Sequence, residues 1–120
     1  MLWIRIGSLG LFLAVALGAF GAHALKSRMS DYMLDVYKTA VLYQLVHALG
    51  LFVVAWLSTI SPDPKIGAAG VFLTLGIVLF SGSLYILSIT QIKWLGAITP
   101  LGGLSFLAGW LLIALSYFPQ

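Results

Sequence analysis

The sequence contains two histidines, His23 and His47, and each lies within a long apolar segment. Imidazole groups in such surroundings can exchange protons, bind metals or hold a haem. If the chain turns back near residue 28, His47 lies roughly 20 Å further along the hairpin axis than His23, at about 1.5 Å per helical residue. Because two axial ligands of one iron need the same depth, this spacing argues against a haem held by both histidines of one protomer.

Polar side chains also gather on one face of the segment that contains His47. On a helical projection, Tyr37, Gln44 and His47 fall within about 80° of one another, and later segments supply hydroxyl groups that could face them. The candidate ligand-binding residues are His23, Tyr37, Gln44, His47, Ser81, Tyr85 and Thr99. Two interpretations are open: a hydrogen-bond network that only joins helices, or a pocket for a small ligand or lipid headgroup.

The sequence gives little support for catalysis. Its only acidic residues, Asp31, Asp35 and Asp63, lie at the ends of apolar segments, so none is placed to act as a buried general base or to bind a hard metal. Proton-coupled export through a small four-helix protein would need such a carboxylate in mid-membrane. The chain has no cysteine and no Gly-x-Ser-x-Gly motif. We therefore predict no enzymatic activity, no metal site and no cofactor.

The composition excludes an ordinary water-soluble domain. Hydrophobic residues make up 62% of the 120 positions and charged residues 8%, whereas soluble domains carry roughly 25% charged residues. The lipid bilayer is therefore the expected solvent, and the length fits one domain spanning residues 1–120. The formal charge of +3 comes from scattered side chains without a basic stripe, so nucleic acid is not an expected partner.

Short polar breaks divide the chain into four apolar segments, at about residues 4–25, 31–59, 66–90 and 100–118. Each is close to the roughly 20 residues that a helix needs to cross a bilayer. Backbone polar groups in lipid must be satisfied within the segment, so each segment is predicted to be a helix. The pattern indicates an all-α integral membrane protein, a four-helix up-down-up-down bundle. Ser30 and Thr99 are the predicted N-caps of the second and fourth helices.

Basic residues predict the orientation of these helices. With four spans, both termini share one side of the membrane with Arg5 and Lys65, while the opposite side carries more bases. Those bases are Lys26, Arg28, Lys38 and Lys93. The excess favours a cytoplasmic location for the 26–38 and 90–98 loops of a bacterial inner-membrane protein, with both termini in the periplasm.

Small residues recur on one face of the first helix and again in the fourth. The predicted packing residues are Gly7, Gly10, Ala14, Gly18, Gly21, Gly102 and Gly109. Such seams let helix backbones approach closely in a membrane. The first segment also fits a signal peptide, because a basic residue precedes an apolar run that ends in Ala22-His23-Ala24. A signal peptide has no use for a glycine stripe, however, so we expect a retained packing helix.

Four motifs carry a resemblance to a known family. They are GAFGAHAL at 18–25, YQLVHALGL at 43–51, LFSGSLY at 79–85 and ITPLGGLSFLAGW at 98–110. Together they resemble the bacterial family called domain of unknown function 423, to which the eukaryotic transmembrane protein 256 is related. The resemblance implies a small four-helix inner-membrane protein and implies no activity.

The sequence favours binding over chemistry. We expect a non-catalytic accessory or scaffolding component of a membrane assembly, surrounded by the lipid bilayer and associated with its own copies or with another membrane protein. The alternative is a small carrier or binder of an apolar solute or lipid, which would use the polar pocket between the helices.

Overall fold

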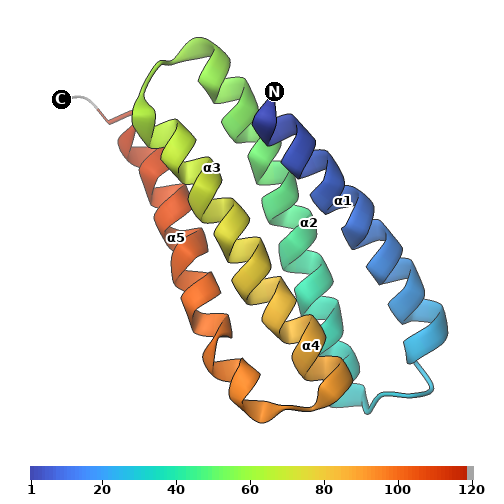
Figure 1. Cartoon of the computed structure of the whole chain (residues 1–120). Helices are drawn as coiled ribbons and strands as arrows, with labels where there is room; N and C mark the ends of the chain where they lie inside the picture. The colour runs from blue at the N-terminus through green and yellow to red at the C-terminus, as the bar shows by residue number, and fades with distance from the viewer. Residues whose placement is uncertain (119–120) are drawn as a thin grey trace.

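Four long antiparallel helices make up the computed structural model, which describes residues 1–118 (Figure 1). The first is α1 (Leu2–Phe20), extended by the π-helical turn η1 (Gly21–Leu25), and the second is α2 (Asp31–Ile60). The third combines α3 (Pro64–Gly76), the π-helical turn η2 (Ile77–Ser81) and α4 (Gly82–Thr90). The fourth combines the 3₁₀ turn η3 (Lys93–Ala97) with α5 (Thr99–Leu115). All four are long and apolar enough to cross a membrane, which confirms the predicted all-α membrane bundle.

Local sequence signals explain where the helices begin and end. The Ser30 side chain accepts a hydrogen bond of 3.2 Å from the Met33 backbone N–H at the start of α2. Asp63 accepts one of 2.8 Å from the Lys65 backbone N–H at the start of α3, where Pro64 occupies the first turn. Gln91 adopts a left-handed conformation with φ of 59° and terminates α4.

Two details differ from the sequence prediction. The N-cap of α5 is Ile98, and Thr99 already lies in the helix, so the predicted cap at Thr99 is wrong. Its hydroxyl lies 2.7 Å from the hydroxyl of Ser83 on α4 instead. The second difference is that the first and third helices each contain a π-helical turn, which the hydrophobic pattern does not reveal because one extra residue in a turn leaves the segment equally apolar.

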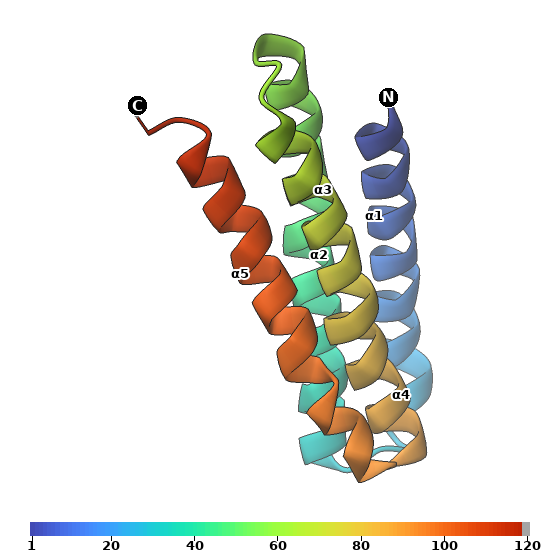
Figure 2. The same ribbon diagram turned by 60° about the vertical axis from the view of Figure 1, so that its left-hand side comes forward.

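The helix α2 lies between α1 and the third helix. In Figure 1, α1 runs along one flank of α2 and α5 lies on the opposite side of the molecule, next to α3. Figure 2 shows α5 leaning away from the bundle towards its C-terminal end. The buried apolar core lies where α2, α3 and α5 meet, and its residues are Leu51, Val54, Leu57, Ile66, Ala69, Leu73 and Phe106.

The small-residue face of α1 packs against α2. A Cβ added at Gly10 would lie 3.0 Å from the Cβ of Ala48, and one at Gly18 would lie 3.2 Å from Cγ1 of Val41. Ala14, between them, is fully buried. We call this contact, made by Gly7, Gly10, Ala14, Gly18 and Gly21, the α1 seam.

A second small-residue seam joins α5 to α3 and η2. A Cβ at Gly109 would lie 2.8 Å from Cδ2 of Leu73, and one at Gly102 would collide with the backbone nitrogen of Phe80. We call the contact made by Gly102 and Gly109 the α5 seam. The structure therefore uses both predicted seams for packing within one protomer.

Candidate functional site

Gln44 is the centre of a polar contact that joins three helices. Its side chain is 5% exposed and reaches from α2 to α1, where Nε2 donates a hydrogen bond of 2.9 Å to the Gly10 carbonyl. On its other side Oε1 accepts a hydrogen bond of 2.7 Å from the Tyr85 hydroxyl of α4. A Cβ at Gly10 would lie 3.0 Å from the Cβ of Ala48, so the glycine lets α1 and α2 approach closely where this hydrogen bond forms.

Tyr37 extends this contact towards the loop end of α1. Its hydroxyl donates to the Leu17 carbonyl of α1, and its ring meets that of Tyr85 edge to face, with centroids 5.3 Å apart. The ring covers Gly21, where an added Cβ would collide with it. We call Tyr37, Gln44 and Tyr85, which the structure brings together as predicted, the tyrosine–glutamine network.

His47 lies apart from this network, in an aromatic stack. Its ring lies 14° from parallel with the Phe106 ring of α5, with centroids 3.4 Å apart. The Tyr43 ring stacks with His47 and with Phe80. Nδ1 of His47 lies 2.7 Å from the Tyr43 carbonyl one turn earlier, which fixes a proton on that nitrogen as the donor. The aromatic stack comprises Tyr43, His47, Phe80, Phe106 and Trp110.

The predicted hydroxyl groups form separate bridges between helices. Ser81, at the end of η2, donates a hydrogen bond of 2.8 Å to the Ala40 carbonyl of α2. Thr99 meets Ser83 across the α4–α5 junction, as described above. Ser105 of α5 donates a bond of 2.6 Å to the Phe72 carbonyl of α3. Each bridge thus connects two helices through a main-chain carbonyl or a second hydroxyl.

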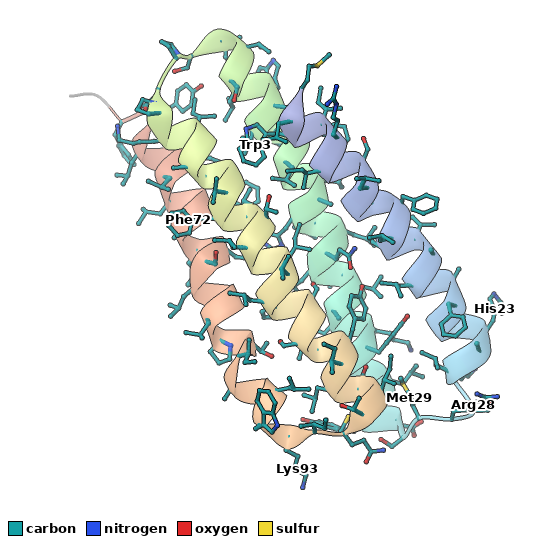
Figure 3. All side chains as sticks on the ribbon, in the orientation of Figure 1. Trp3, His23, Arg28, Met29, Phe72 and Lys93 are labelled. Carbon is teal, nitrogen blue, oxygen red and sulfur yellow. The ribbon has the colours of Figure 1, made fainter. Side chains whose placement is uncertain are left out.

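His23 is not part of any of these contacts. It lies in η1 at the loop end of the first helix, and its side chain is exposed and points away from the bundle (Figure 3). The interpretation that places His23 with Gln44 and His47 in one pocket is therefore not supported by its position. A helix face is uncertain within a π-helical turn, because the turn rotates the following residues away from the regular 100° spacing.

The buried polar side chains of the described residues all form hydrogen bonds. Within residues 1–118, every buried side-chain nitrogen or oxygen has a hydrogen-bond partner. The same residues contain no group of three or more histidines, cysteines or acids that could hold a metal ion. Buried polar side chains whose hydrogen bonds are all formed favour one packing arrangement of the helices.

Phe106 and Ser105 join helices through the packed interior but are not among the predicted site residues. Both lie in the motif ITPLGGLSFLAGW, which drew attention through its glycines. The i, i+3 and i+7 spacing of Gly102, Ser105 and Gly109 was the available signal, because it places the serine on the packed face of α5. Nothing in an apolar helix shows in advance which of its aromatic rings meets a histidine.

Comparison of the sequence with known proteins shows the family to which the chain is similar. The model of the family described as protein of unknown function DUF423 matches residues 17–103. The UPF0382 membrane protein YwdK of Bacillus subtilis (strain 168) is 52% identical over 115 residues, which cover 95% of this chain and 94% of the relative. A UPF0382 membrane protein of Staphylococcus haemolyticus (strain JCSC1435) is 49% identical over 117 residues, covering 98% and 95%. No solved structure matches the chain.

These relatives cover nearly the whole chain and are named as membrane proteins, in agreement with its four membrane-capable helices. They confirm the resemblance that the four motifs carry. The chain belongs to the DUF423 family, a family of membrane proteins whose function is not established.

Proposed function

We propose that this protein is a non-catalytic accessory or scaffolding component of an inner-membrane assembly. The observation that supports the proposal most is the use of its buried polar side chains. Gln44, Tyr37 and Ser81 each donate to a main-chain carbonyl of a neighbouring helix. A side chain held in this way stabilises helix packing and would have to give up its bond before it could bind a solute. The interior is thus better suited to fixing the helices than to processing a substrate.

The outward faces of the flanking helices would then provide the interaction surface. The side chains of Phe12 on α1 and Leu107 on α5 are 70% and 66% exposed. Because both seams are occupied within the protomer, a partner helix would have to pack on these larger apolar side chains. A second copy of the chain and another membrane protein are both suitable partners.

Photo-crosslinking in native membranes tests this proposal. A photoreactive amino acid replaces Phe12 in one variant and Leu107 in another, and adducts are identified by mass spectrometry. The proposal expects one protein adduct of constant mass from one of the faces, either a copy of the chain or one identified partner. Each position serves as the control for the other, since a partner on one face leaves lipid on the opposite face. Lipid adducts alone at both positions would contradict the proposal.

The predicted orientation is part of the same proposal. It follows from the excess of bases at the end of the molecule that carries Arg28 and Lys93 (Figure 3). The chain contains no cysteine, so single cysteines can be placed by Ser27→Cys and by Ser61→Cys. We expect a membrane-impermeant maleimide to label Ser61→Cys in intact spheroplasts and Ser27→Cys only after permeabilisation. The reverse pattern would place the termini in the cytoplasm.

The carrier alternative has one observation in its favour. A hollow of about 320 Å³ lies beside the aromatic stack, lined by Leu42, Tyr43, Val46 and His47. A solute bound there would be lost in His47→Phe, which keeps a ring against Phe106 and removes the nitrogens. A small molecule that co-purifies with folded wild type and is absent from folded His47→Phe would favour the carrier over the scaffold.

A further inference from the structure

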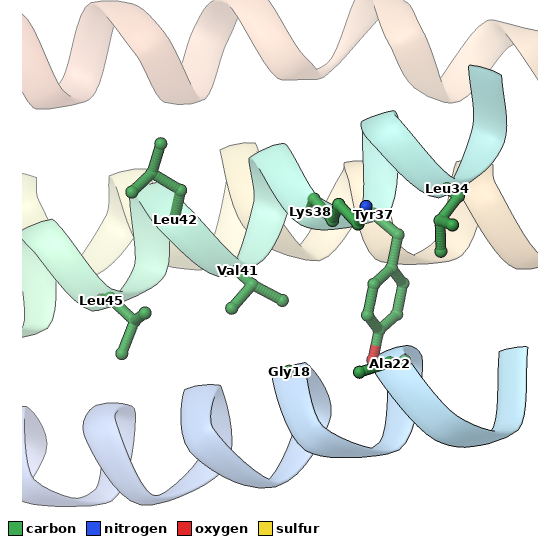
Figure 4. Close-up of a pocket in the computed structure, with 9 residues that line it drawn as sticks. Gly18, Ala22, Leu34, Tyr37, Lys38, Val41, Leu42 and Leu45 are labelled. Carbon is green, nitrogen blue, oxygen red and sulfur yellow. The ribbon is translucent and has the colours of Figure 1, made fainter. Parts of the chain in front are cut away.

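The two helices of the first hairpin leave an apolar groove near their loop end. It has a volume of about 240 Å³ and lies beside the last residues of the α1 seam, where Gly18 and Ala22 offer almost no side chain (Figure 4). The opposite wall comes from α2, from Tyr37 and the aliphatic side chains of Val41, Leu42 and Leu45. In Figure 4 the Tyr37 ring crosses from α2 to α1 between Leu34 and Val41. The groove is thus an apolar hollow between α1 and α2.

Positive charge borders the groove at the loop end. A second hollow of about 160 Å³ shares Gly21, Ala22, Leu34 and Lys38 with the groove and adds Lys26. In the part of the chain that the structure describes, the one ion pair is Lys65–Asp63, at the other end of the bundle. Neither Lys26 nor Lys38 forms an ion pair with a carboxylate of the described residues, and Asp35 lies one turn before Lys38 on α2. Lys38 lines both hollows, so the apolar and basic parts form one continuous surface.

The depth of these lysines matches the level of lipid phosphates. The 30 residues of α2 give it a length of about 45 Å, and the hydrocarbon core of a bilayer is about 30 Å thick. The charged residues of α2, Asp31, Asp35 and Lys38, all lie in its first eight residues, so this end is the part that extends into the headgroup layer. Lysines at this level attract anionic lipids, and their stems can lie along the apolar wall with the ammonium groups at the interface.

We propose that this groove is a binding site for one anionic phospholipid. Its phosphate lies between the ammonium groups of Lys26 and Lys38, and one acyl chain lies in the groove along Val41, Leu42 and Leu45. The basic end and the apolar groove match the two parts of the lipid in the order in which the bilayer presents them. A zwitterionic lipid would fill the groove equally well, but its own cationic group would offset the attraction to the two lysines.

Native mass spectrometry of the full chain in detergent tests the site. The probes are phosphatidylglycerol and phosphatidylcholine with identical acyl chains, added in a titration. We expect one phosphatidylglycerol per protomer to bind at concentrations where phosphatidylcholine leaves most of the protein free. In Lys26→Gln/Lys38→Gln the affinity for phosphatidylglycerol should fall about thirtyfold, which equals about 2 kcal/mol.

Two control variants separate the site from general effects. Arg5→Gln/Lys93→Gln removes the same charge away from the groove and should keep its affinity within about a factor of two. Ala22→Leu fills the groove while leaving both lysines in place, and it should weaken binding of phosphatidylglycerol. Ala19→Leu adds the same volume at an exposed position of α1 outside the groove and should not. Circular dichroism and thermal unfolding establish that each variant is folded before its affinity is compared.

Four outcomes would overturn the proposal. The first is equal binding of the two lipids, and the second is an equal loss of affinity in the two charge variants. The third is displacement of bound phosphatidylglycerol by glycerol 3-phosphate at matching concentration, since the site would then be one for a free anion. The fourth is a dimer that excludes the lipid and that Ala22→Leu disrupts, since the groove would then hold a second copy of the chain.

Discussion

Two glycine seams hold the flanking helices, and they differ in what faces the glycines. Along the α1 seam, the atoms opposite Gly18 and Gly21 belong to the side chains of Val41 and Tyr37. Along the α5 seam, the two atoms nearest Gly102 belong to the backbone of Phe80. Gly7 and Gly109 each face both a side chain and a main-chain carbonyl oxygen, so the contrast lies between Gly102 and the pair Gly18 and Gly21. A side chain can change rotamer when a methyl group is added opposite it, whereas a helix backbone can only move as a whole. Gly102 should therefore tolerate substitution less well than Gly18 or Gly21.

The seams also differ in their polar contacts. Side chains of α2 donate to carbonyls of α1 at Gly10 and Leu17, so α1 is held by packing and by long-range hydrogen bonds. On the other flank, Ser105 of α5 donates to the Phe72 carbonyl of α3, and the hydroxyl of Thr99 on α5 lies 2.7 Å from that of Ser83 on α4. The α1 main chain therefore accepts hydrogen bonds from side chains of α2, whereas α5 contributes its own side-chain hydroxyls.

The largest effect is expected from Gly102→Ala. The new Cβ would collide with the backbone nitrogen of Phe80 and lie 2.7 Å from its Cα, so α5 has to move away from η2. We expect a loss of about 3 kcal/mol in the free energy of unfolding, measured by denaturation in mixed micelles. The adjacent Gly103→Ala is the control, because its nearest atom, Cδ2 of Phe80, lies 3.9 Å away. Equal stability of the two variants would contradict the backbone contact.

A smaller effect is expected on the other flank from Gly21→Ala. The new methyl group would displace the Tyr37 ring and thereby break its hydrogen bond to the Leu17 carbonyl. We expect a loss of about 2 kcal/mol. Gly18→Ala should cost less than about 1 kcal/mol, because Cγ1 of Val41, 3.2 Å from the new atom, can rotate away. A larger loss in Gly18→Ala than in Gly21→Ala would show that the ring position is not what closes this end of the α1 seam.

The polar part of the comparison is tested by Gln44→Leu and Tyr85→Phe. Each single variant removes one partner of the 2.7 Å hydrogen bond between Oε1 and the tyrosine hydroxyl, and we expect each to cost about 1 kcal/mol. The double variant should cost less than the sum of the two, because the second change removes a group that the first left unpaired. Additive losses in this double-mutant cycle would mean that the two side chains act independently.

The smallest effect concerns pH and the turn between α2 and α3. The backbone N–H of Lys65 donates to the Asp63 carboxylate and, together with the Lys65 ammonium group, lowers the pKa of Asp63 below its ordinary value of 3.8. A lowered pKa means that the cap stabilises the folded state at neutral pH and that this contribution is lost as the pH falls below 3.8. The melting temperature of wild type should decrease slightly more than that of Asp63→Asn between about pH 6 and about pH 3. An identical decrease in both proteins would contradict the role of this carboxylate.

Much of this fold follows from the sequence because a few physical rules dominate it. Long apolar segments with short breaks can only be helices in lipid, and the spacing of Gly7, Gly10, Ala14 and Gly18 predicts which face of α1 is packed. What the spacing does not provide is the identity of the opposite surface. Whether a glycine meets a side chain or a backbone depends on the register of two helices, and neither helix encodes that register alone.

For the candidate site, too, the sequence predicts which face of a helix is packed but not which residue it meets. The shared face of Tyr37 and Gln44 predicted their contact with neighbouring helices, and Tyr85 was correctly included among their partners. His47 lies on that face too, but its partner is the Phe106 ring, which packing alone determines. His23 follows the start of a π-helical turn, so regular helical spacing assigned it to a face that it does not occupy.

The central claim is that the polar interior holds the bundle together while the outer surface binds partners. Native mass spectrometry of the protein extracted gently from its own membrane tests it most directly, on wild type, on His47→Phe and on Lys26→Gln/Lys38→Gln. We predict complexes with a further copy or another membrane protein that are present in both wild type and His47→Phe. A small bound molecule that is lost in His47→Phe but retained in Lys26→Gln/Lys38→Gln, with no protein partner in either, would contradict the account and indicate a carrier.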